Sequence, residues 1–364
     1  MNILILTGRF GMGHYSTAIS LKQEIIRDIS DSHVRIIDIV DYMTPKFQKI
    51  IYSGFNLLVQ RASGLYNFVY RNTTDLGLTI SMPFANILVS KVERLINETN
   101  PDIVISTLPL CSKIISEYKE RTSSSLPLVT CITDISTHSE WINPKTDLYF
   151  VATDIVKEDL FNIGIPAKNI LVSGIPVKEQ FKELYDNKSR KNTKVKKILI
   201  MGGGLGLIPL EDHFYDMLSN IDDLEVTIIA GGNKKIYDRL FGKYVNINVI
   251  GYTDRVYEHM ADSDLIISKA GGITLFESIY AGLPILVLCP FLEQEKNNAH
   301  FIEDKSIGKV IWNKSEDISK IVLDMIADED GLLEMQKNMR NIKSTLNNRA
   351  ILDMINRVGN TQVA

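Results

Sequence analysis

The sequence predicts an α/β protein with two domains, and two observations carry this prediction. Short apolar runs alternate with glycine turns and helix-patterned segments, first from Ile3 and again from Ile198. This is the order of strand, turn and helix in a parallel sheet that is covered by helices. A chain of 364 residues, of which 45% are hydrophobic and 23% charged, is also long enough for two separate cores. We therefore expect two Rossmann-like domains that face each other across a cleft.

The composition argues against several classes of protein. A formal net charge of −4 and a pI near 5.9 disfavour a general nucleic-acid-binding protein. The three cysteines contain no CxxC pair and lie in or beside apolar strand-like runs, so we expect buried, reduced thiols and neither disulfides nor zinc. These cysteines are Cys111, Cys131 and Cys289.

No targeting signal and no membrane-spanning helix is expected. The apolar run at residues 1–6 lacks a basic start and is too short for a signal peptide, so it is interpreted as the first strand. The most apolar long region, residues 265–292, is interrupted by Lys269 and Glu277. If membranes matter for this protein, we expect it to visit only their surface.

The first domain begins with a strand at residues 3–6, and the turn GRFGMGH at residues 8–14 leads into a helix. His14 falls at the N-terminus of that helix. Because the positive end of the helix dipole disfavours a second positive charge, we expect a lowered pKa and a neutral imidazole near pH 7. A general base needs this state, although a histidine in a glycine loop is also common as a structural or exposed residue.

After a second strand at residues 34–39, the pattern changes at residues 42–74. This stretch is apolar, aromatic and basic, and it contains no acidic residue. Such a composition favours a segment that lies among lipid headgroups, while the alternative is a set of buried helices with incidental basic residues. The acceptor or membrane contacts that we expect here are Tyr52, Phe55, Tyr66, Tyr70 and Arg71.

Two further strands, at residues 102–106 and 128–133, are each followed by polar loop residues. Functional groups in open α/β sheets collect at such strand ends. Asp134 directly follows the second of these strands, although an aspartate in this position is also a common helix cap. Strands at 148–152 and 170–172 follow. The run NKSRKNTKVKK at residues 187–197 carries six basic residues and indicates a solvated linker or, alternatively, charge that faces a membrane.

The second domain repeats the alternation with strands at residues 198–201, 226–229 and 247–250, each before a glycine turn. The first of these turns, GGGLG, is not the dinucleotide fingerprint GxGxxG in its usual first position. No acidic residue ends a suitable next strand, so NAD is disfavoured. A strand at 309–312 and helices through residue 358 complete the chain.

The stretch at residues 264–298 reads as strand, glycine turn, helix, strand and polar loop. Because Gly271 and Gly272 lack Cβ atoms, an anionic group can approach the backbone there, and the free N–H groups and positive end of the following helix favour a diphosphate. Side chains that can add hydrogen-bond donors are Ser268, Lys269 and Thr274.

Two sets of polar residues in the same stretch suit the other parts of a nucleotide sugar. Glu277 lies on the helix, away from its apolar side, and its carboxylate can accept hydrogen bonds from both hydroxyls of a ribose. The amides and carboxylates after Pro290 suit a hexose, whose hydroxyls each donate and accept. The residues expected to contact the sugar are Gln294, Glu295 and Asn298.

The segment at residues 264–298 resembles the nucleotide-sugar-binding half of GT-B glycosyltransferases related to the peptidoglycan N-acetylglucosaminyltransferase. It is most similar to the monogalactosyldiacylglycerol synthase and processive diacylglycerol glucosyltransferase family. The resemblance runs from residue 8 to about residue 304. The motifs that carry it are GMGH at 11–14, TDISTHSEW at 133–141, GIPV at 174–177 and QEKNNAHFIED at 294–304.

The resemblance implies roles for individual residues. Gly13 and His14 close the first loop on the acceptor side, and Asp134 orients a base or is itself the base. His138 contacts donor or acceptor, and Trp141 lines the pocket. The stretch at 50–73 looks like the helical insertion of the diacylglycerol-glycosylating branch. In the second domain, the turns that approach the donor and the nucleotide base supply Gly203, Gly204, Tyr252 and Thr253.

These observations predict the reaction and its setting. We expect an inverting transfer of a hexose from UDP-glucose or UDP-galactose to diacylglycerol, by a cytoplasmic enzyme that sits peripherally on the anionic inner face of the cell membrane. No convincing DxD motif or other cluster of carboxylates lies near a glycine loop. We therefore expect no metal and no cofactor, and we expect Lys269 with the helix dipole to take the place of a metal. No nucleic-acid partner is expected.

Three alternatives remain open at this level. The first is a transferase of the same fold with a polyprenyl-linked or soluble acceptor. The second is a non-hydrolysing UDP-sugar 2-epimerase, which also has two Rossmann-like halves. The third is a nucleotide-sugar-binding regulator without catalysis. The sequence distinguishes neither glucose from galactose nor one transferred sugar from several.

The expected domain division follows from these segments. Residues 1–175 form the acceptor-binding, membrane-facing domain and residues 176–197 the linker. Residues 198–340 form the UDP-sugar-binding domain. The fold that the chain resembles implies that residues 341–364 form a helix that returns to the first domain.

Overall fold

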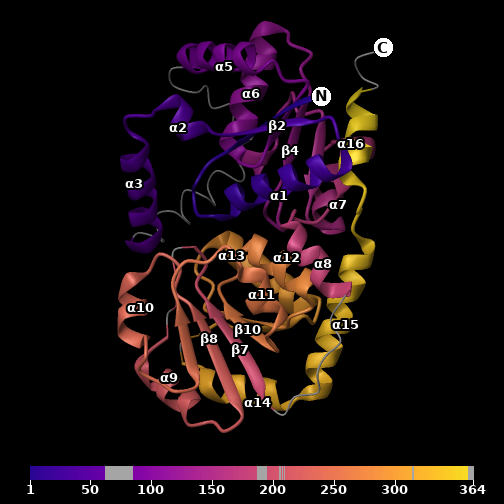
Figure 1. Ribbon diagram of the computed structural model, residues 1–364. Helices are drawn as coiled ribbons and strands as arrows, with labels where there is room; N and C mark the ends of the chain where they lie inside the picture. Colours follow the sequence, from indigo (N-terminus) through magenta and orange to yellow (C-terminus); the bar gives the residue numbers. More distant parts are fainter. Residues whose placement is uncertain are drawn as a thin grey trace. The chain divides into compact units, whose positions relative to one another are not determined.

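The computed structural model describes residues 1–61, 85–186, 195–204, 206, 208, 210–313 and 315–359. The chain divides into two compact units (Figure 1). The first consists of Met1–Lys178 and Leu346–Ala364, and the second of Glu179–Thr345. Each unit contains a six-stranded sheet in which all strand pairs are parallel.

The sheet of the first unit has the strand order β2-β1-β3-β4-β5-β6. Its strands are β1 (Asn2–Thr7), β2 (His33–Asp38), β3 (Ile103–Ser106), β4 (Leu128–Cys131), β5 (Leu148–Val151) and β6 (Ile170–Val172). Its α-helices are α1 (Gly13–Asp28), α2 (Ile39–Met43), α3 (Gln48–Arg61), α5 (Ala85–Thr99), α6 (Pro109–Thr122), α7 (Asp154–Asn162) and α16 (Ala350–Gly359). Two short 3₁₀ helices are η1 (Ser139–Trp141) and η2 (Ala167–Asn169).

Strand β1 is buried on both of its faces, which explains its unbroken apolar run. Ile3 and Ile5 belong to a cluster with residues of α1 and α16. Leu4 and Leu6 belong to a second cluster with residues of α5 and α6. Successive side chains of a strand point to opposite faces, so a central strand between two helical layers needs apolar residues at every position.

The second sheet has the strand order β12-β11-β10-β7-β8-β9. Its strands are β7 (Lys196–Met201), β8 (Leu224–Ile229), β9 (Ile247–Ile250), β10 (Leu265–Ser268), β11 (Ile285–Leu288) and β12 (Gly308–Ile311). The helices are α8 (Glu179–Asp186), α9 (Asp212–Ser219), α10 (Lys234–Leu240), α11 (Val256–Ala261), α12 (Gly272–Ala281), α13 (Glu293–Asp304), α14 (Ile318–Ala327) and α15 (Glu329–Thr345).

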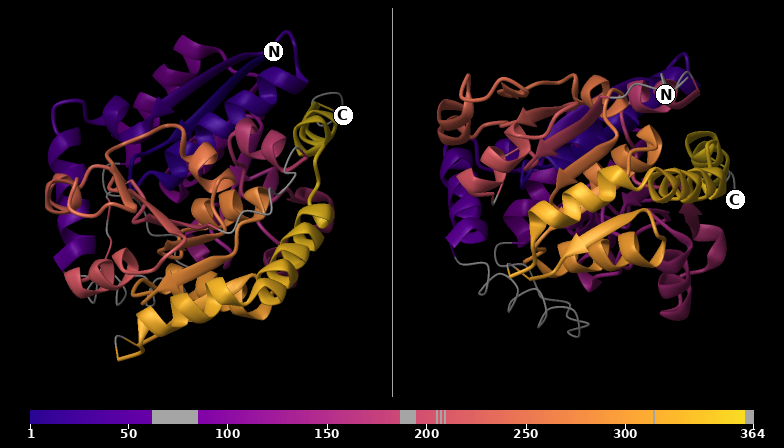
Figure 2. Two further views of the ribbon diagram at one scale, coloured as in Figure 1. Left: turned by 60° about the horizontal axis from the view of Figure 1, so that its bottom comes forward. Right: turned by 90° about the horizontal axis from the view of Figure 1, so that it is seen from below.

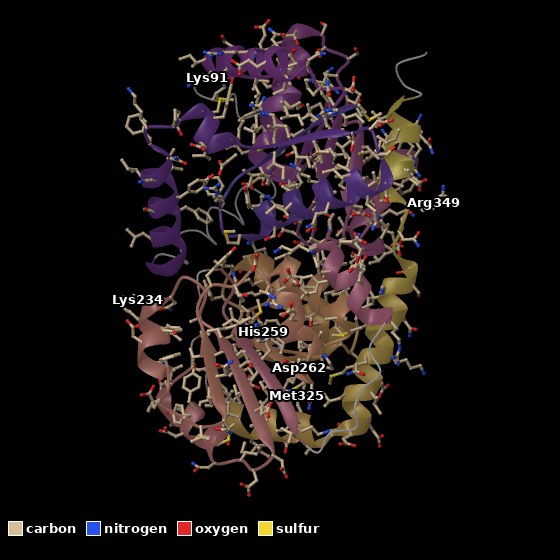
Figure 3. All side chains as sticks on the ribbon, viewed as in Figure 1. Lys91, Lys234, His259, Asp262, Met325 and Arg349 are labelled. Carbon is tan, nitrogen blue, oxygen red and sulfur yellow. The ribbon has the colours of Figure 1, made fainter. Side chains whose placement is uncertain are left out.

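Helices cover the second sheet as they cover the first. Met325 of α14 lies in the apolar cluster that includes Ile198 and Ile200 of β7 (Figure 3). Helix α15 packs against α12 and α14, and Figure 2 shows α14 and α15 as consecutive yellow helices. The strands predicted in this half of the chain are all present.

The structure divides the chain differently from the sequence-based expectation at two places. Residues 176–197 were expected to be a linker, but they contain α8, whose Phe181 is buried and packs edge-on against Tyr257 of α11. Residues 341–364 were expected to be one helix. Instead, α15 continues to Thr345, and α16 is a separate helix in the core of the first unit. The backbone N–H of Asn347 donates to the Val172 carbonyl at 2.9 Å, which holds the crossover segment to the end of β6.

Candidate active site

In the first unit, the residues that directly follow three neighbouring strands lie close together. Strands β1, β3 and β4 are adjacent and parallel, so the loops after Thr7, Ser106 and Cys131 leave the same edge of the sheet. His14, the second residue of α1, is contacted by one residue that follows β3 and by one that follows β4. Its Nδ1 lies 2.9 Å from the Thr133 hydroxyl oxygen, and the Thr107 hydroxyl donates to its backbone carbonyl at 3.0 Å.

Asp134 lies beside His14 and is held by an indole. The Trp141 Nε1–H donates to a carboxylate oxygen of Asp134 at 3.1 Å. The rings of His14 and Trp141 have centroids 6.1 Å apart. Together, the imidazole, the carboxylate and the indole form a compact group of side chains that β1, β4 and η1 support.

Burial changes the protonation of both groups. It lowers the pKa of His14 below 6.5, while the Asp134 carboxylate and the Thr107 backbone act in the opposite direction. Burial also raises the pKa of Asp134 above 3.8, and it is opposed by His14, the Trp141 N–H and His138. The lowered His14 pKa agrees in direction with the expectation from the sequence. Its principal cause is desolvation, whereas the sequence argument relied on the helix dipole.

Trp141 and His138 are both buried in the first unit. Trp141 is 1% exposed and belongs to the apolar cluster around β5 and α7. His138 is 2% exposed, and its Nδ1 accepts a hydrogen bond from the Glu140 N–H at 3.3 Å. Trp141 was expected to line the pocket, and here its indole supports Asp134 from within the core.

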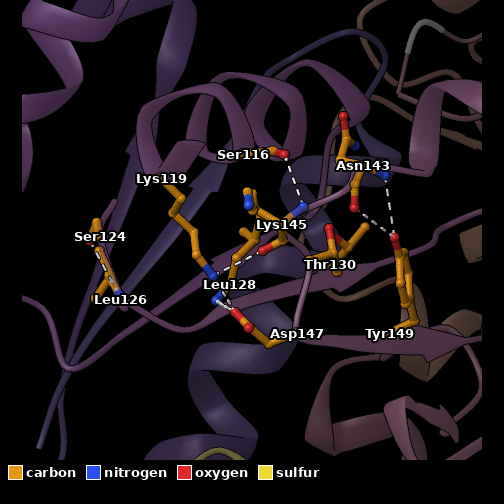
Figure 4. A network of polar contacts seen from close by, with 11 residues as sticks. Ser116, Lys119, Ser124, Leu126, Leu128, Thr130, Asn143, Lys145, Asp147 and Tyr149 are labelled. Carbon is orange, nitrogen blue, oxygen red and sulfur yellow. Dashed lines mark hydrogen bonds and ion pairs between the residues drawn. The ribbon is translucent and has the colours of Figure 1, made fainter. Parts of the chain in front are cut away.

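A polar network anchors the segment that carries these residues (Figure 4). The Lys119 ammonium pairs with Asp147, and that carboxylate also accepts the Leu128 N–H at 2.7 Å. The Tyr149 hydroxyl lies 3.3 Å from the Asn143 backbone nitrogen. The Asn143 side chain donates to the Trp141 carbonyl at 3.3 Å. The network ties η1 to β4 and β5 and so fixes the position from which Trp141 reaches Asp134.

Some of the expected acceptor and membrane residues lie in the described part of the chain, and others do not. Tyr52 and Phe55 of α3 turn toward the first loop, where their ring centroids lie 5.1 Å and 5.0 Å from that of Phe10. Gly13 begins α1 and directly precedes His14. Tyr66, Tyr70 and Arg71 lie outside the described residues.

In the second unit, β7, β10 and β11 are adjacent, so the turns that follow them share one edge. The side chain of Lys269 spans two of these turns. Its Cε lies 3.2 Å from the place where a Cβ on Gly203 would be, and 4.0 Å from that of Gly271. Gly203 also has φ +67°, a left-handed conformation that glycine adopts readily. Glycine at position 203 therefore leaves room for both the turn and the lysine.

Helix α12 presents its N-terminus to the same edge. Its N-cap is Gly271, which provides no side-chain cap, and the helix starts at Gly272. The first N–H groups of a helix have no partner within the helix, and its positive end favours an anion. Thr274, in this first turn, is 5% exposed. Gly204 lies in the adjoining turn after β7, beside Gly203.

Helix α13 supplies the remaining polar groups and corrects the expectation of a loop. Gln294, Glu295 and Asn298 all lie on this helix. The Lys269 ammonium lies 3.1 Å from Glu295 Oε1, and Asn298 Nδ2 donates to the Ala270 carbonyl at 2.8 Å. These contacts bring α13 onto the turn between β10 and α12.

Three buried oxygen atoms next to this turn lack a hydrogen-bond partner in the described part of the chain. They are Ser268 Oγ, Glu295 Oε2 and Asn298 Oδ1, and each of these residues is at most 2% exposed. Buried polar atoms in native proteins are normally satisfied, because an unsatisfied one costs about 1 to 3 kcal/mol. Their grouping beside a lysine and a helix N-terminus makes this turn a candidate site for a polar ligand.

The other residues expected to contact the UDP-sugar lie on α12, on α13 and after β9. Glu277 on α12 and Gln294 on α13 are half-buried. Tyr252 is 71% exposed, and the Thr253 hydroxyl accepts the Arg255 N–H at 3.1 Å within its own turn. Both follow β9, the edge strand, which β7 and β8 separate from β10. The structure thus groups Lys269 with the glycine turns and α13, while Tyr252 and Thr253 stand at another part of the edge.

Sequence reasoning missed Thr107 and Thr133 as groups that hold His14. Each follows a short β-rich strand directly or after one residue, and a threonine at that position was the signal available. Their partner could not be found from the sequence, since Thr107 and His14 are separated by 93 positions. Among the described residues, no group of three His, Cys, Asp or Glu side chains is arranged to hold a metal ion.

Comparison with known proteins agrees with this two-part arrangement. Residues 14–177 match the family model for monogalactosyldiacylglycerol (MGDG) synthase. Residues 197–350 match the model for the glycosyltransferase family 28 C-terminal domain.

One relative and two solved structures show how far the likeness extends. The processive diacylglycerol beta-glucosyltransferase of Bacillus subtilis (strain 168) is 30% identical, over 97% of this chain and 94% of that protein. Acinetobacter baumannii MurG has a TM-score of 0.65 at 15% identity, with 99% of each chain covered. The UDP-GlcNAc 2-epimerase of Neisseria meningitidis has a TM-score of 0.57 at 17% identity, with 92% and 94% covered.

The structural likenesses establish the fold, and the sequence relative establishes the family. Two parallel sheets with covering helices and the match to MurG confirm the predicted GT-B fold. The similarity to the B. subtilis protein, at 30% identity, covers nearly all of this chain and therefore both units. This chain therefore belongs to the monogalactosyldiacylglycerol synthase and processive diacylglycerol glucosyltransferase family of GT-B glycosyltransferases.

Proposed function

We propose that this enzyme transfers a hexose from a UDP-sugar to the free hydroxyl of diacylglycerol, with inversion at the anomeric carbon and without a metal ion. The observation that supports the UDP-sugar donor is the group of three buried oxygens beside Lys269 and the α12 N-terminus, for which the described residues provide no hydrogen-bond partner. A diphosphate suits the lysine and the helix end. Sugar hydroxyls, which donate hydrogen bonds, suit unpartnered acceptor oxygens.

The proposed reaction is one in-line displacement. His14 or Asp134 removes the proton of the acceptor hydroxyl as that oxygen forms a bond to the anomeric carbon. The bond between the anomeric carbon and the UDP oxygen breaks, and UDP leaves with the electron pair. Lys269 and the N-terminus of α12 stabilise the charge on the departing diphosphate, which is the task that a metal ion performs in other enzymes.

The lipid acceptor is favoured by the family and by the outward side of α3. The B. subtilis relative is named for transfer to diacylglycerol. On α3 and just before it, Phe47 is 59% exposed, Ile50 69% and Leu57 51%. Lys46 and Lys49 lie in the same stretch, and residues 42–61 contain no acid. An apolar surface with positive charge suits an anionic bilayer, so we propose peripheral attachment at the inner face of the cell membrane.

None of the helices in the described part of the chain combines the length and apolar character that crossing a bilayer requires. An epimerase has a similar fold, but its substrate would give the exposed apolar residues of α3 no role.

The test is UDP release with UDP-glucose or UDP-galactose, each with and without liposomes that contain diacylglycerol, followed by extraction of the lipid. We expect UDP release that requires diacylglycerol, and a new glycolipid whose sugar identifies the donor. A Lys269→Met variant is the control for release from the proposed donor site. Isomerisation of the UDP-sugar without lipid would instead establish an epimerase, and binding without turnover would establish a regulator.

A further inference from the structure

Helix α3 contacts the loop before His14 through an aromatic clasp, which consists of Phe10, Tyr52 and Phe55. The ring of Phe10 packs edge-on against both α3 rings, with centroids 5.1 Å from Tyr52 and 5.0 Å from Phe55. Phe10 also packs over the turn at Gly8 and against the apolar cluster beneath it. One loop side chain is therefore fixed by two residues of a helix that begins 38 positions later.

A polar bridge reinforces the clasp. The Tyr52 hydroxyl accepts the Arg9 N–H at 2.9 Å and donates to Asp38 Oδ1 at 2.6 Å. Asp38 caps α2 by accepting the N–H groups of Val40 and Asp41. Burial and the Asp38 carboxylate raise the pKa of Tyr52, so its hydroxyl keeps the proton that it donates. The bridge thus joins the loop backbone, α3 and the start of α2.

The loop is short and ends at the candidate base. Phe10 is four positions before His14, with Gly11 at φ +73° between them. His14 is also held at its other side by Thr107 and Thr133. Because so few residues separate Phe10 from His14, a displacement of Phe10 should also displace the His14 imidazole.

The opposite side of α3 carries the exposed apolar residues Ile50 and Leu57, and Phe47 lies just before the helix. Lys49 lies on the helix beside Ile50, and Lys46 precedes it. This combination fits an anionic lipid surface, where apolar side chains enter the acyl boundary and lysines meet the phosphates. The same helix therefore has one side for a bilayer and another for the loop.

We propose that Phe10 and Tyr52 are positioning residues, which transmit the docking of α3 on an anionic bilayer to the loop that carries His14. The inference rests on the proposed function for its lipid acceptor. When α3 is held by lipid, the clasp restrains Phe10, and the Tyr52 bridge restrains the Arg9 backbone. The loop before His14 then becomes ordered at the surface where the acceptor is found, and transfer is faster there than with a dissolved acceptor.

The first test is hydrogen–deuterium exchange with vesicles of phosphatidylglycerol and phosphatidylcholine, and with phosphatidylcholine vesicles as the uncharged control. In the unmodified enzyme, the anionic vesicles should slow exchange in both α3 and residues 8–14. In Phe10→Ala, exchange in α3 should slow as before, while exchange in residues 8–14 should not. Phe161→Ala, which removes an aromatic ring that is 58% exposed on α7, is the matched control and should behave like the unmodified enzyme.

The second test uses enzyme kinetics to separate the roles of the aromatic clasp, the Tyr52 bridge and the exposed side of α3. With diacylglycerol in anionic vesicles, Phe10→Ala should lower kcat about tenfold because two edge-to-face aromatic contacts are lost, with the KM for the UDP-sugar unchanged. Tyr52→Phe keeps the ring and removes the bridge, so its loss should be smaller. With a water-soluble short-chain diacylglycerol, the loss of kcat in both variants should be smaller than with vesicles, because no bilayer then holds α3. Ile50→Asp should lose vesicle binding while it keeps turnover of the soluble acceptor.

Several outcomes would overturn the inference. They are slowed exchange at residues 8–14 in Phe10→Ala, no slowing there in the unmodified enzyme, or an absence of vesicle binding. An equal loss of kcat with soluble and vesicle acceptors would also overturn it. The exchange measurement needs no turnover, so an enzyme that binds vesicles and orders its loop but transfers no sugar would contradict the proposed function alone.

Discussion

The Lys269 ammonium lies 3.1 Å from the Glu295 carboxylate, which is 2% exposed and whose second oxygen lacks a hydrogen-bond partner in the described part of the chain. The pair joins two turns and a helix, since Lys269 also covers Gly203 and Gly271. A buried carboxylate needs a compensating charge, and here that charge lies where a diphosphate is expected to bind. Glu295 therefore holds Lys269 in place.

The first prediction concerns this pair. Lys269→Met leaves the buried Glu295 charge uncompensated and should lower the free energy of unfolding by about 2 to 3 kcal/mol. Adding Glu295→Gln to that variant should restore part of the loss, with a coupling of about 1 kcal/mol or more. Urea unfolding of both single variants and of the double variant measures the coupling. Strictly additive effects would show that the two side chains do not depend on each other.

The second prediction concerns the nucleoside. If Glu277 accepts the ribose hydroxyls, Glu277→Ala should raise the KM for the UDP-sugar by about tenfold or more, because hydrogen bonds to a charged group contribute about 1.5 to 3 kcal/mol. The value of kcat should change little, because the ribose lies away from the reacting bond. Initial rates at varied UDP-sugar concentration test this. An unchanged KM would remove Glu277 from the donor site.

The third prediction distinguishes the two candidate bases. His14→Ala should lower kcat by a factor of about 10² to 10⁴, with the KM for the UDP-sugar nearly unchanged, because a general base acts on the acceptor. Steady-state kinetics with diacylglycerol vesicles measure both constants. Trp141→Phe provides a comparison, because it removes the indole N–H that donates to Asp134 and keeps the His14 side chain and an aromatic ring beside it. Full turnover of His14→Ala would assign the base role to Asp134.

The fourth prediction concerns pH. Burial holds the pKa of His14 below 6.5, and the Asp134 carboxylate is the strongest influence that opposes this. Replacing Asp134 by Asn should therefore lower the His14 pKa further. Proton NMR titration of the imidazole signals tests this shift, with His14→Gln used to identify the His14 signal among the six histidines. A pKa that rises in Asp134→Asn would contradict the assigned electrostatics.

The same shift predicts a pH dependence of stability. Between pH 6.5 and the folded-state pKa of His14, the unfolded chain binds a proton that the folded chain does not. The contribution of His14 to the free energy of unfolding is therefore present above pH 6.5 and is lost as the pH falls through the folded-state pKa. Urea unfolding over this range should show a shallower pH dependence in His14→Gln than in the unmodified protein.

The fifth prediction concerns metals. If Lys269 and the α12 N-terminus alone stabilise the departing diphosphate, EDTA should leave the rate of transfer unchanged. The measurement is UDP release before and after removal of divalent ions. Loss of activity that magnesium or manganese restores would show that a metal takes part. Such a result would leave the family and the fold unaffected.

The sequence alone determined the fold class, the positions of the strands and the family. Central strands of a parallel sheet are buried on both faces, so they must be apolar throughout, and the glycine turns after β7 and β10 mark where the chain enters a loop. These properties are local and can be read along the chain. Motifs such as GMGH and QEKNNAHFIED are also contiguous, which is why they identified the family.

Only the tertiary structure decided which polar side chains are partners. His14 meets Thr133 from 119 positions away, and Lys269 meets Glu295 from 26 positions away. The structure also buries Trp141 in the core and packs Tyr52 against Phe10, which the sequence did not predict. The physical reason is that a side chain's role depends on burial and on the groups that surround it. Those groups come from strands and helices that only folding brings to one edge of a sheet.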